Sequence, residues 1–153
     1  MPTHPADLYG ELDKTTVTYV LDMGRPFEDL RQVAAQLAGV LLLAAARSKF
    51  ATPQHPVLGI ASVSFERAME SIQSATVPAR AQHHHVHMLK SARLIGDALA
   101  SCKSTGALSA ELDFLLSILR EAWDELRSAA AALPGFEVVA FDRACCAEHV
   151  RLS

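Results

Sequence analysis

The pattern that most constrains this chain's fold is apolar residues at helical spacing, in four stretches of about twenty residues. The clearest stretch is 109–132, with apolar positions at Leu112, Leu115, Leu116, Leu119, Trp123, Leu126 and Ala130. This spacing is typical of an amphipathic α-helix. Ser109 is a favoured N-cap residue, Glu111 suits the first turn, and residues 133–135 (Leu-Pro-Gly) end the helix.

Three further helices are predicted upstream. The first spans 26–49: Pro26 suits the first helical position, and carboxylates near the start and basic residues near the end match the helix dipole. Through residues 40–43 it is apolar nearly all round, so we expect burial on more than one side. The second spans 56–75 and the third spans 78–103.

Short links between long amphipathic helices predict antiparallel neighbours. We therefore expect an all-α, up-down four-helix bundle made of a single domain over residues 1–153. Residues 15–21 and 136–141 have strand-like composition. They could pair as a two-stranded ribbon or pack as extended arms, and the first segment also fits helical spacing.

Composition excludes several classes. The net charge is −3 and the arginines are scattered, so we expect no nucleic-acid partner. The longest nearly apolar run, 33–46, is too short to span a bilayer, and the first residues do not resemble a signal peptide. The three cysteines (Cys102, Cys145 and Cys146) lack the spacing of a disulfide framework. These features favour a cytoplasmic protein with no membrane contact.

Four of the seven histidines fall within five positions of the third predicted helix: His83, His84, His85 and His87. If Ala92 marks the centre of the buried face, His85 lies in line with the core and His84 at its edge. His83 and His87 then lie on the exposed side. The four rings cannot converge on one ion. His85 is either a core residue with hydrogen-bonded nitrogens or a ligand directed into the bundle.

A metal site is one alternative for the exposed pair. His83 and His87 are four residues apart, the spacing at which two imidazoles on a helix chelate zinc or nickel. No Glu stands between them in an H-E-x-x-H pattern. Further ligands would come from elsewhere in the chain or from the same pair on a second subunit. Otherwise both are solvated surface side chains.

The C-terminal tail offers other candidate ligands. Cys145 and His149 are also four residues apart, and a thiolate with an imidazole suits zinc or copper. Cys145 and Cys146 could equally pack as small hydrophobic side chains, and we place Cys102 in the core.

Residues 87–96 (HMLKSARLIG) resemble the motif of histidine-phosphotransfer domains, in which an exposed histidine on a four-helix bundle accepts a phosphoryl group. The resemblance implies that His87 is the phosphoacceptor, that Lys90 stabilises the phosphoryl charge and that Gly96 is the small residue nearby. Ser91 stands where the family has glycine, and Gly96 comes one residue early.

Arg80 and His85 are similar in spacing to the Arg-x4–6-His signature of HEPN ribonucleases, which are also all-α. The resemblance implies phosphate binding by Arg80 and acid–base chemistry by His85. Ala81 follows Arg80 where the family usually has a polar residue.

The chain lacks a glycine-rich phosphate loop, a Gly-x-Ser-x-Gly elbow and the paired Glu-x-x-His motif of di-iron bundles. Phe114 and Ile118 widen the apolar surface of the fourth helix, as residues 40–43 do for the first. We therefore expect a non-enzymatic interaction or regulatory protein that forms a homodimer or binds a partner protein through apolar helix faces. We expect no cofactor. Zinc or nickel binding at His83 and His87 is the first alternative, and phosphotransfer through His87 with Lys90 is the second.

Overall fold

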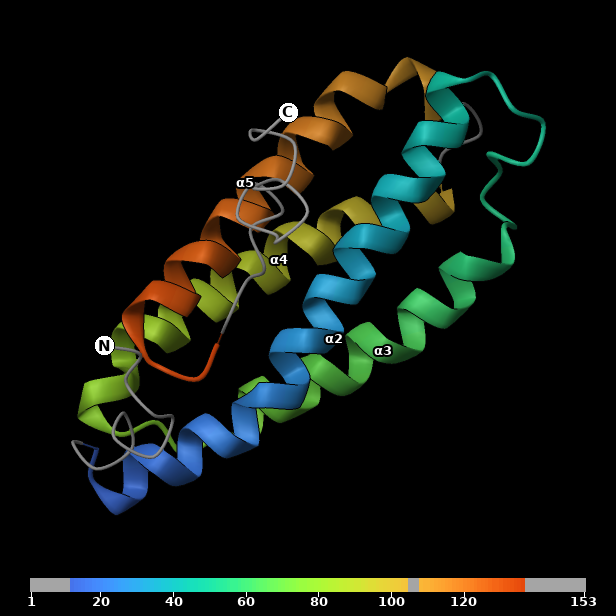
Figure 1. Cartoon of the computed structure of the whole chain (residues 1–153). Coiled ribbons are helices and arrows are strands. Elements are labelled where there is room, and N and C mark those ends of the chain that lie inside the picture. Colours follow the sequence, from blue (N-terminus) through green and yellow to red (C-terminus); the bar gives the residue numbers. More distant parts are fainter. Residues whose placement is uncertain (1–11, 105–107, 137–153) are drawn as a thin grey trace, which may run out of the picture.

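The computed structural model describes residues 12–104 and 108–136, and within these ranges all regular structure is helical (Figure 1). The α-helices are α2 (Lys14–Ala45), α3 (Pro56–Ser74), α4 (Gln82–Ser104) and α5 (Leu112–Ala132), with short 3-10 helices η1 (Ala79–Ala81) and η2 (Leu108–Ala110). Consecutive α-helices run antiparallel, and the α2–α3 and α4–α5 pairs have the most extensive contacts. The predicted all-α, up-down four-helix bundle is confirmed.

Helix α2 begins twelve residues before the predicted start at Pro26, so that start is wrong. The Asp13 carboxylate caps it, accepting a hydrogen bond from the Thr16 amide at 2.7 Å. Residues 15–21 are therefore helical, not strand-like. Their threonines and valines suggested a strand, but the buried positions Thr16, Tyr19 and Val20 share the spacing of the helix that follows. Pro26 lies inside α2, where its missing N–H leaves one helical hydrogen bond unmade.

Other boundaries differ by less. Helix α2 ends at Ala45 instead of residue 49, and Arg47 has a φ of 54° in the turn that follows. Helix α5 begins at Leu112, because Ser109 belongs to η2 and does not cap it. Phe136 is buried beyond the end of α5, and residues 137–141 of the second strand-like segment lie outside the described residues.

The core holds large side chains from all four α-helices, among them Phe27, Leu37, Leu41, Leu58, Ile72, Met88, Ile95, Leu115 and Leu126. The Arg67 guanidinium on α3 donates two hydrogen bonds, of 2.9 and 3.0 Å, to the buried carboxylate of Asp29 on α2. The hydroxyl of Ser91 on α4 donates to the carbonyl oxygen of Ala122 on α5 at 2.9 Å. The first of these contacts joins α2 to α3, and the second joins α4 to α5.

Close approach between α3 and α4 depends on Gly96. A Cβ atom at this position would lie 2.8 Å from Cζ of Phe65. The glycine that the phosphotransfer resemblance placed near the histidine therefore has a packing contact with α3. It lies more than two turns along α4 from His87.

Candidate functional site

The four clustered histidines occupy the first two turns of α4. Because the helices alternate in direction, this end of the bundle also contains the start of α2 and the ends of α3 and α5 (Figure 1). Tyr19 of α2, Glu125 of α5 and Phe136 contact the imidazoles there. We call this group of seven residues the histidine end: Tyr19, His83, His84, His85, His87, Glu125 and Phe136.

The histidines are buried in a different order from the predicted one. His84 is completely buried, His85 and His87 are partly buried, and only His83 is exposed. The buried side chains of α4 include Ser91, Ala98 and Cys102, so their face centres about 60° from Ala92 on a helical wheel. His84 lies near that centre, with His85 and His87 on its two flanks. The prediction centred the buried face on Ala92 and left out Ser91, which packs against α5 through its hydrogen bond to Ala122.

Tyr19 connects two of the imidazoles. Its hydroxyl oxygen lies 2.8 Å from Nδ1 of His84 and 3.1 Å from Nδ1 of His85. The hydroxyl has one hydrogen, so it donates to one ring and accepts from the other. If it accepts from His84, Nε2 of that ring is an unpaired acceptor in the interior. If the hydroxyl instead donates to His84, Nε2 of that ring carries a buried and unpaired N–H, which costs more free energy than a buried unpaired acceptor.

His84 is held as a neutral side chain. Nε2 of its ring is buried and has no hydrogen-bond partner among the described residues, and the ring centroid lies 4.1 Å from that of Phe136. Burial, together with the nearby His85 and His87, lowers the pKa of His84 to about 4. Burial also lowers the pKa of His85 and raises that of Tyr19. The Tyr19–His84–His85 group is therefore uncharged at neutral pH.

The other two histidines face each other. The Nε2 atoms of His83 and His87 are 3.2 Å apart, and the ring planes are nearly perpendicular. On the far side of the His87 ring, Nδ1 lies 2.5 Å from a carboxylate oxygen of Glu125. The His87 side chain is 16% exposed and that of Glu125 is 21% exposed. Solvent therefore reaches the two facing imidazoles, mainly at His83.

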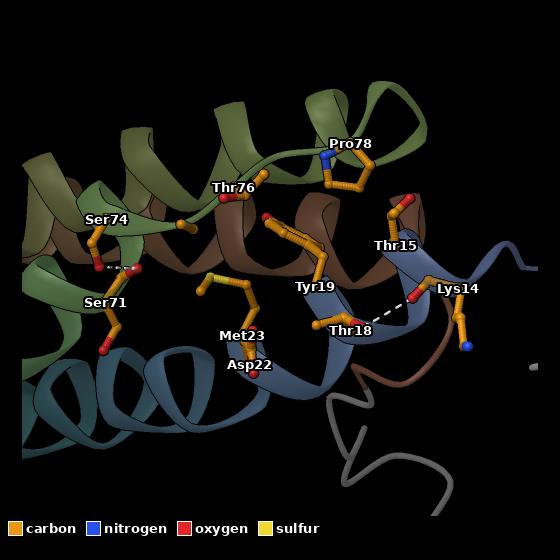
Figure 2. Close-up of a pocket in the computed structure, with 11 residues that line it drawn as sticks. Lys14, Thr15, Thr18, Tyr19, Asp22, Met23, Ser71, Ser74, Thr76 and Pro78 are labelled. Carbon is orange, nitrogen blue, oxygen red and sulfur yellow. Dashed lines mark hydrogen bonds between the residues drawn. The ribbon is translucent and has the colours of Figure 1, made fainter.

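An open pocket of about 790 Å³ lies next to the histidine end (Figure 2). Its lining is rich in hydroxyl groups and comes from α2, α3 and the linker before η1: Lys14, Thr15, Thr18, Tyr19, Asp22, Met23, Ser71, Ser74, Ala75, Thr76 and Pro78. Figure 2 shows Tyr19 between α2 and the linker that carries Thr76 and Pro78. Tyr19 thus belongs both to the pocket wall and to the hydrogen bonds of the buried histidines.

Sequence reasoning missed Tyr19 and Glu125. Tyr19 lies in the segment 15–21, for which a strand-like arm and a helix both stayed open, and no sequence pattern singled out Glu125. The contact from Tyr19 to His84 spans 65 residues and that from Glu125 to His87 spans 38. A local pattern cannot reveal such pairs, although the helical spacing of Tyr19 with Met23 could have placed Tyr19 on a buried face.

The geometry does not favour either resemblance. His87 was expected to be exposed, but it is partly buried between His83 and Glu125, and that carboxylate would repel a phosphoryl group. Lys90 is exposed on α4. Arg80 lies in η1, whereas the hydrogen bond of His85 goes to Tyr19. The candidate ligands Cys145, Cys146 and His149 lie outside the described residues.

Within residues 12–104 and 108–136, no three or more His, Cys, Asp or Glu side chains form a group that could hold a metal ion. None of the helices described is long and apolar enough to cross a membrane. Comparison of the chain with protein-family models, curated proteins and solved structures gives no match.

Proposed function

We propose that this chain is a cytoplasmic interaction or regulatory protein without a catalytic role of its own, and that it self-associates. The proposal rests on large apolar side chains left in solvent. Five of them are each 58–67% exposed, and we call them the apolar end: Leu42, Phe50, Ile60, Val63 and Phe114.

Topology brings these five residues to the same end of the bundle. Leu42 lies in the last turn of α2, Phe50 in the loop that follows and Phe114 in the first turn of α5. Ile60 and Val63 lie in the first half of α3, three residues apart and therefore neighbours on its surface. Helix α2 finishes where α3 and α5 start, opposite the histidine end (Figure 1).

Covering this end would be favourable. Apolar surface removed from water contributes roughly 25 cal/mol per Å², and clustered exposed apolar side chains often mark contact surfaces. A second copy of the chain is the proposed partner. A net charge of only −3 means that two copies repel each other weakly. A two-fold dimer would also place the same apolar residues on both sides of the contact.

Sedimentation equilibrium over the micromolar range tests the proposal. We expect the wild-type chain to dimerise and a double variant, Ile60→Glu with Val63→Glu, to dissociate. Leu21→Glu is the matched control, because Leu21 is 69% exposed but lies near the start of α2, away from the apolar end. All these side chains are exposed, so urea unfolding should show that each variant still folds.

Two results would overturn the proposal. One is a wild-type chain that stays monomeric throughout the range. The other is a dimer that survives the double substitution on α3 but is lost with Leu21→Glu.

A further inference from the structure

We propose that His83 and His87 chelate one divalent transition-metal ion through their Nε2 atoms, with Glu125 as the residue that positions His87. Zinc, nickel and copper are the ions whose chemistry suits two imidazoles. This site lies at the histidine end, and it is independent of the proposed self-association at the opposite end of the bundle.

The separation of the two nitrogens fits such a chelate. Zinc–imidazole bonds of 2.0–2.1 Å at a tetrahedral angle place the two nitrogens roughly 3.3 Å apart. A square-planar ion, as copper or nickel prefers, brings them to roughly 2.9 Å with bonds of the same length. The observed distance between Nε2 of His83 and Nε2 of His87, 3.2 Å, lies between these values. The separation of the two nitrogens therefore needs little change for binding.

Glu125 adds an independent observation. Its carboxylate accepts the Nδ1 hydrogen of His87, which leaves the Nε2 lone pair of that ring directed at His83. Ligating histidines commonly have such a carboxylate on the other ring nitrogen, where it fixes the tautomer and makes the imidazole a stronger ligand. The contact joins α5 to α4, so the bundle itself holds the His87 ring in place.

The rest of the coordination shell would be open. No third protein ligand is present among the described residues, and His83 is exposed. Water, or a donor atom from another molecule, would fill the remaining positions. We therefore expect moderate affinity, with copper bound more tightly than nickel or zinc.

A metal-free interpretation of the same distance is a hydrogen bond in which Nε2–H of His83 donates to Nε2 of His87. Zinc titration of the full untagged chain, followed by calorimetry and by ¹⁵N NMR of the imidazoles, distinguishes chelation from this hydrogen bond. Chelation predicts one zinc per chain, with large shifts of both Nε2 resonances and no such shifts at His55. His83→Gln and His87→Gln should each abolish zinc binding at this site, and His55→Gln should leave it unchanged.

Glu125 is tested as a positioning residue by Glu125→Ala. We expect zinc affinity to fall by roughly 10- to 100-fold. In the metal-free protein the same substitution should shift the ¹⁵N signals of His87 away from the Nδ1–H tautomer. A role in folding alone would not change that tautomer in a protein that remains folded.

Several outcomes would overturn the proposal. One is a wild-type chain that binds neither zinc, nickel nor copper with its imidazoles. A second is binding that survives His83→Gln; His83 is exposed, so this variant should fold even if His87→Gln does not. A third is binding that disappears with Cys145→Ser and Cys146→Ser but not with the histidine variants, which would assign the metal to the C-terminal tail.

Discussion

The buried His84 ring should make the stability of this protein fall steeply in mild acid. Its pKa is about 4 in the folded chain and 6.5 for an ordinary histidine, which we take for the unfolded chain. Below pH 6.5 the unfolded state binds a proton that the folded state does not, so the free energy of unfolding decreases as the pH falls. The loss of stability reaches about 3 kcal/mol at the folded pKa and levels off below it.

The two pKa values also fix the loss at intermediate pH. Between about pH 7.5 and pH 5 the His84 contribution is roughly 2 kcal/mol. The lowered pKa of His85 acts in the same direction and adds to it. Carboxylates remain mostly ionised above about pH 5, so they contribute little over this range.

Urea unfolding, followed by the fluorescence of the single tryptophan, Trp123, measures the effect. A chelator in the buffer removes any contribution from bound metal. His84→Asn and His84→Phe eliminate the titrating ring. Between about pH 7.5 and pH 5, each variant should therefore lose roughly 2 kcal/mol less of its free energy of unfolding than the wild type does.

Ser91→Ala is the matched control. It removes another completely buried polar side chain from α4, one that donates to Ala122 and does not titrate in this range. We expect it to lower stability by about 1 kcal/mol at every pH and to keep the wild-type slope. The reasoning is refuted if the wild type loses no stability toward pH 5, or if the folded His84 variants retain its full slope.

Three further substitutions test packing and hydrogen bonds. Tyr19→Phe removes the hydroxyl that is hydrogen-bonded to Nδ1 of His84 and to Nδ1 of His85. This substitution should cost about 1–3 kcal/mol near neutral pH, because the His84 ring is fully buried, and an unchanged urea midpoint would contradict this. Gly39→Ala should stabilise α2 by about 0.5–1 kcal/mol, since a Cβ there meets nothing within 4 Å. Gly96→Ala should be less stable than Gly39→Ala by at least about 1 kcal/mol, because its Cβ would crowd Phe65; equal thermal midpoints would refute the packing argument.

The fold was predictable because hydrophobic spacing is a local property of the chain. Helix α5 is the clearest case, since most of its predicted stripe is buried or partly buried against the rest of the bundle. The start of α2 was not predictable in the same way. Pro26 is suited to a first turn, and this signal outweighed the helical spacing of residues 15–21, which belong to the same helix.

The candidate site was predictable only in part. The sequence identified His83 and His87 as a pair and predicted that the four rings do not converge on one ion. It misplaced His84 and His85 because the buried arc of α4 depends on three neighbouring helices, not on its own large apolar residues. The contacts with Tyr19 and Glu125 arise only when α2 and α5 pack against α4.

The ion pair between Asp29 and Arg67 has a consequence for how α2 and α3 are aligned. Helix α2 has 32 residues and α3 has 19, which correspond to about 48 Å and 28 Å. Apolar contacts are non-directional, so α3 could slide by one turn along its longer neighbour and still bury a hydrophobic stripe. The bidentate contact between Arg67 and Asp29 is directional. If α3 slid by one turn, about 5.4 Å, the Asp29 carboxylate would stay buried without its partner. The ion pair between Asp29 and Arg67 therefore fixes the register of α3 along α2.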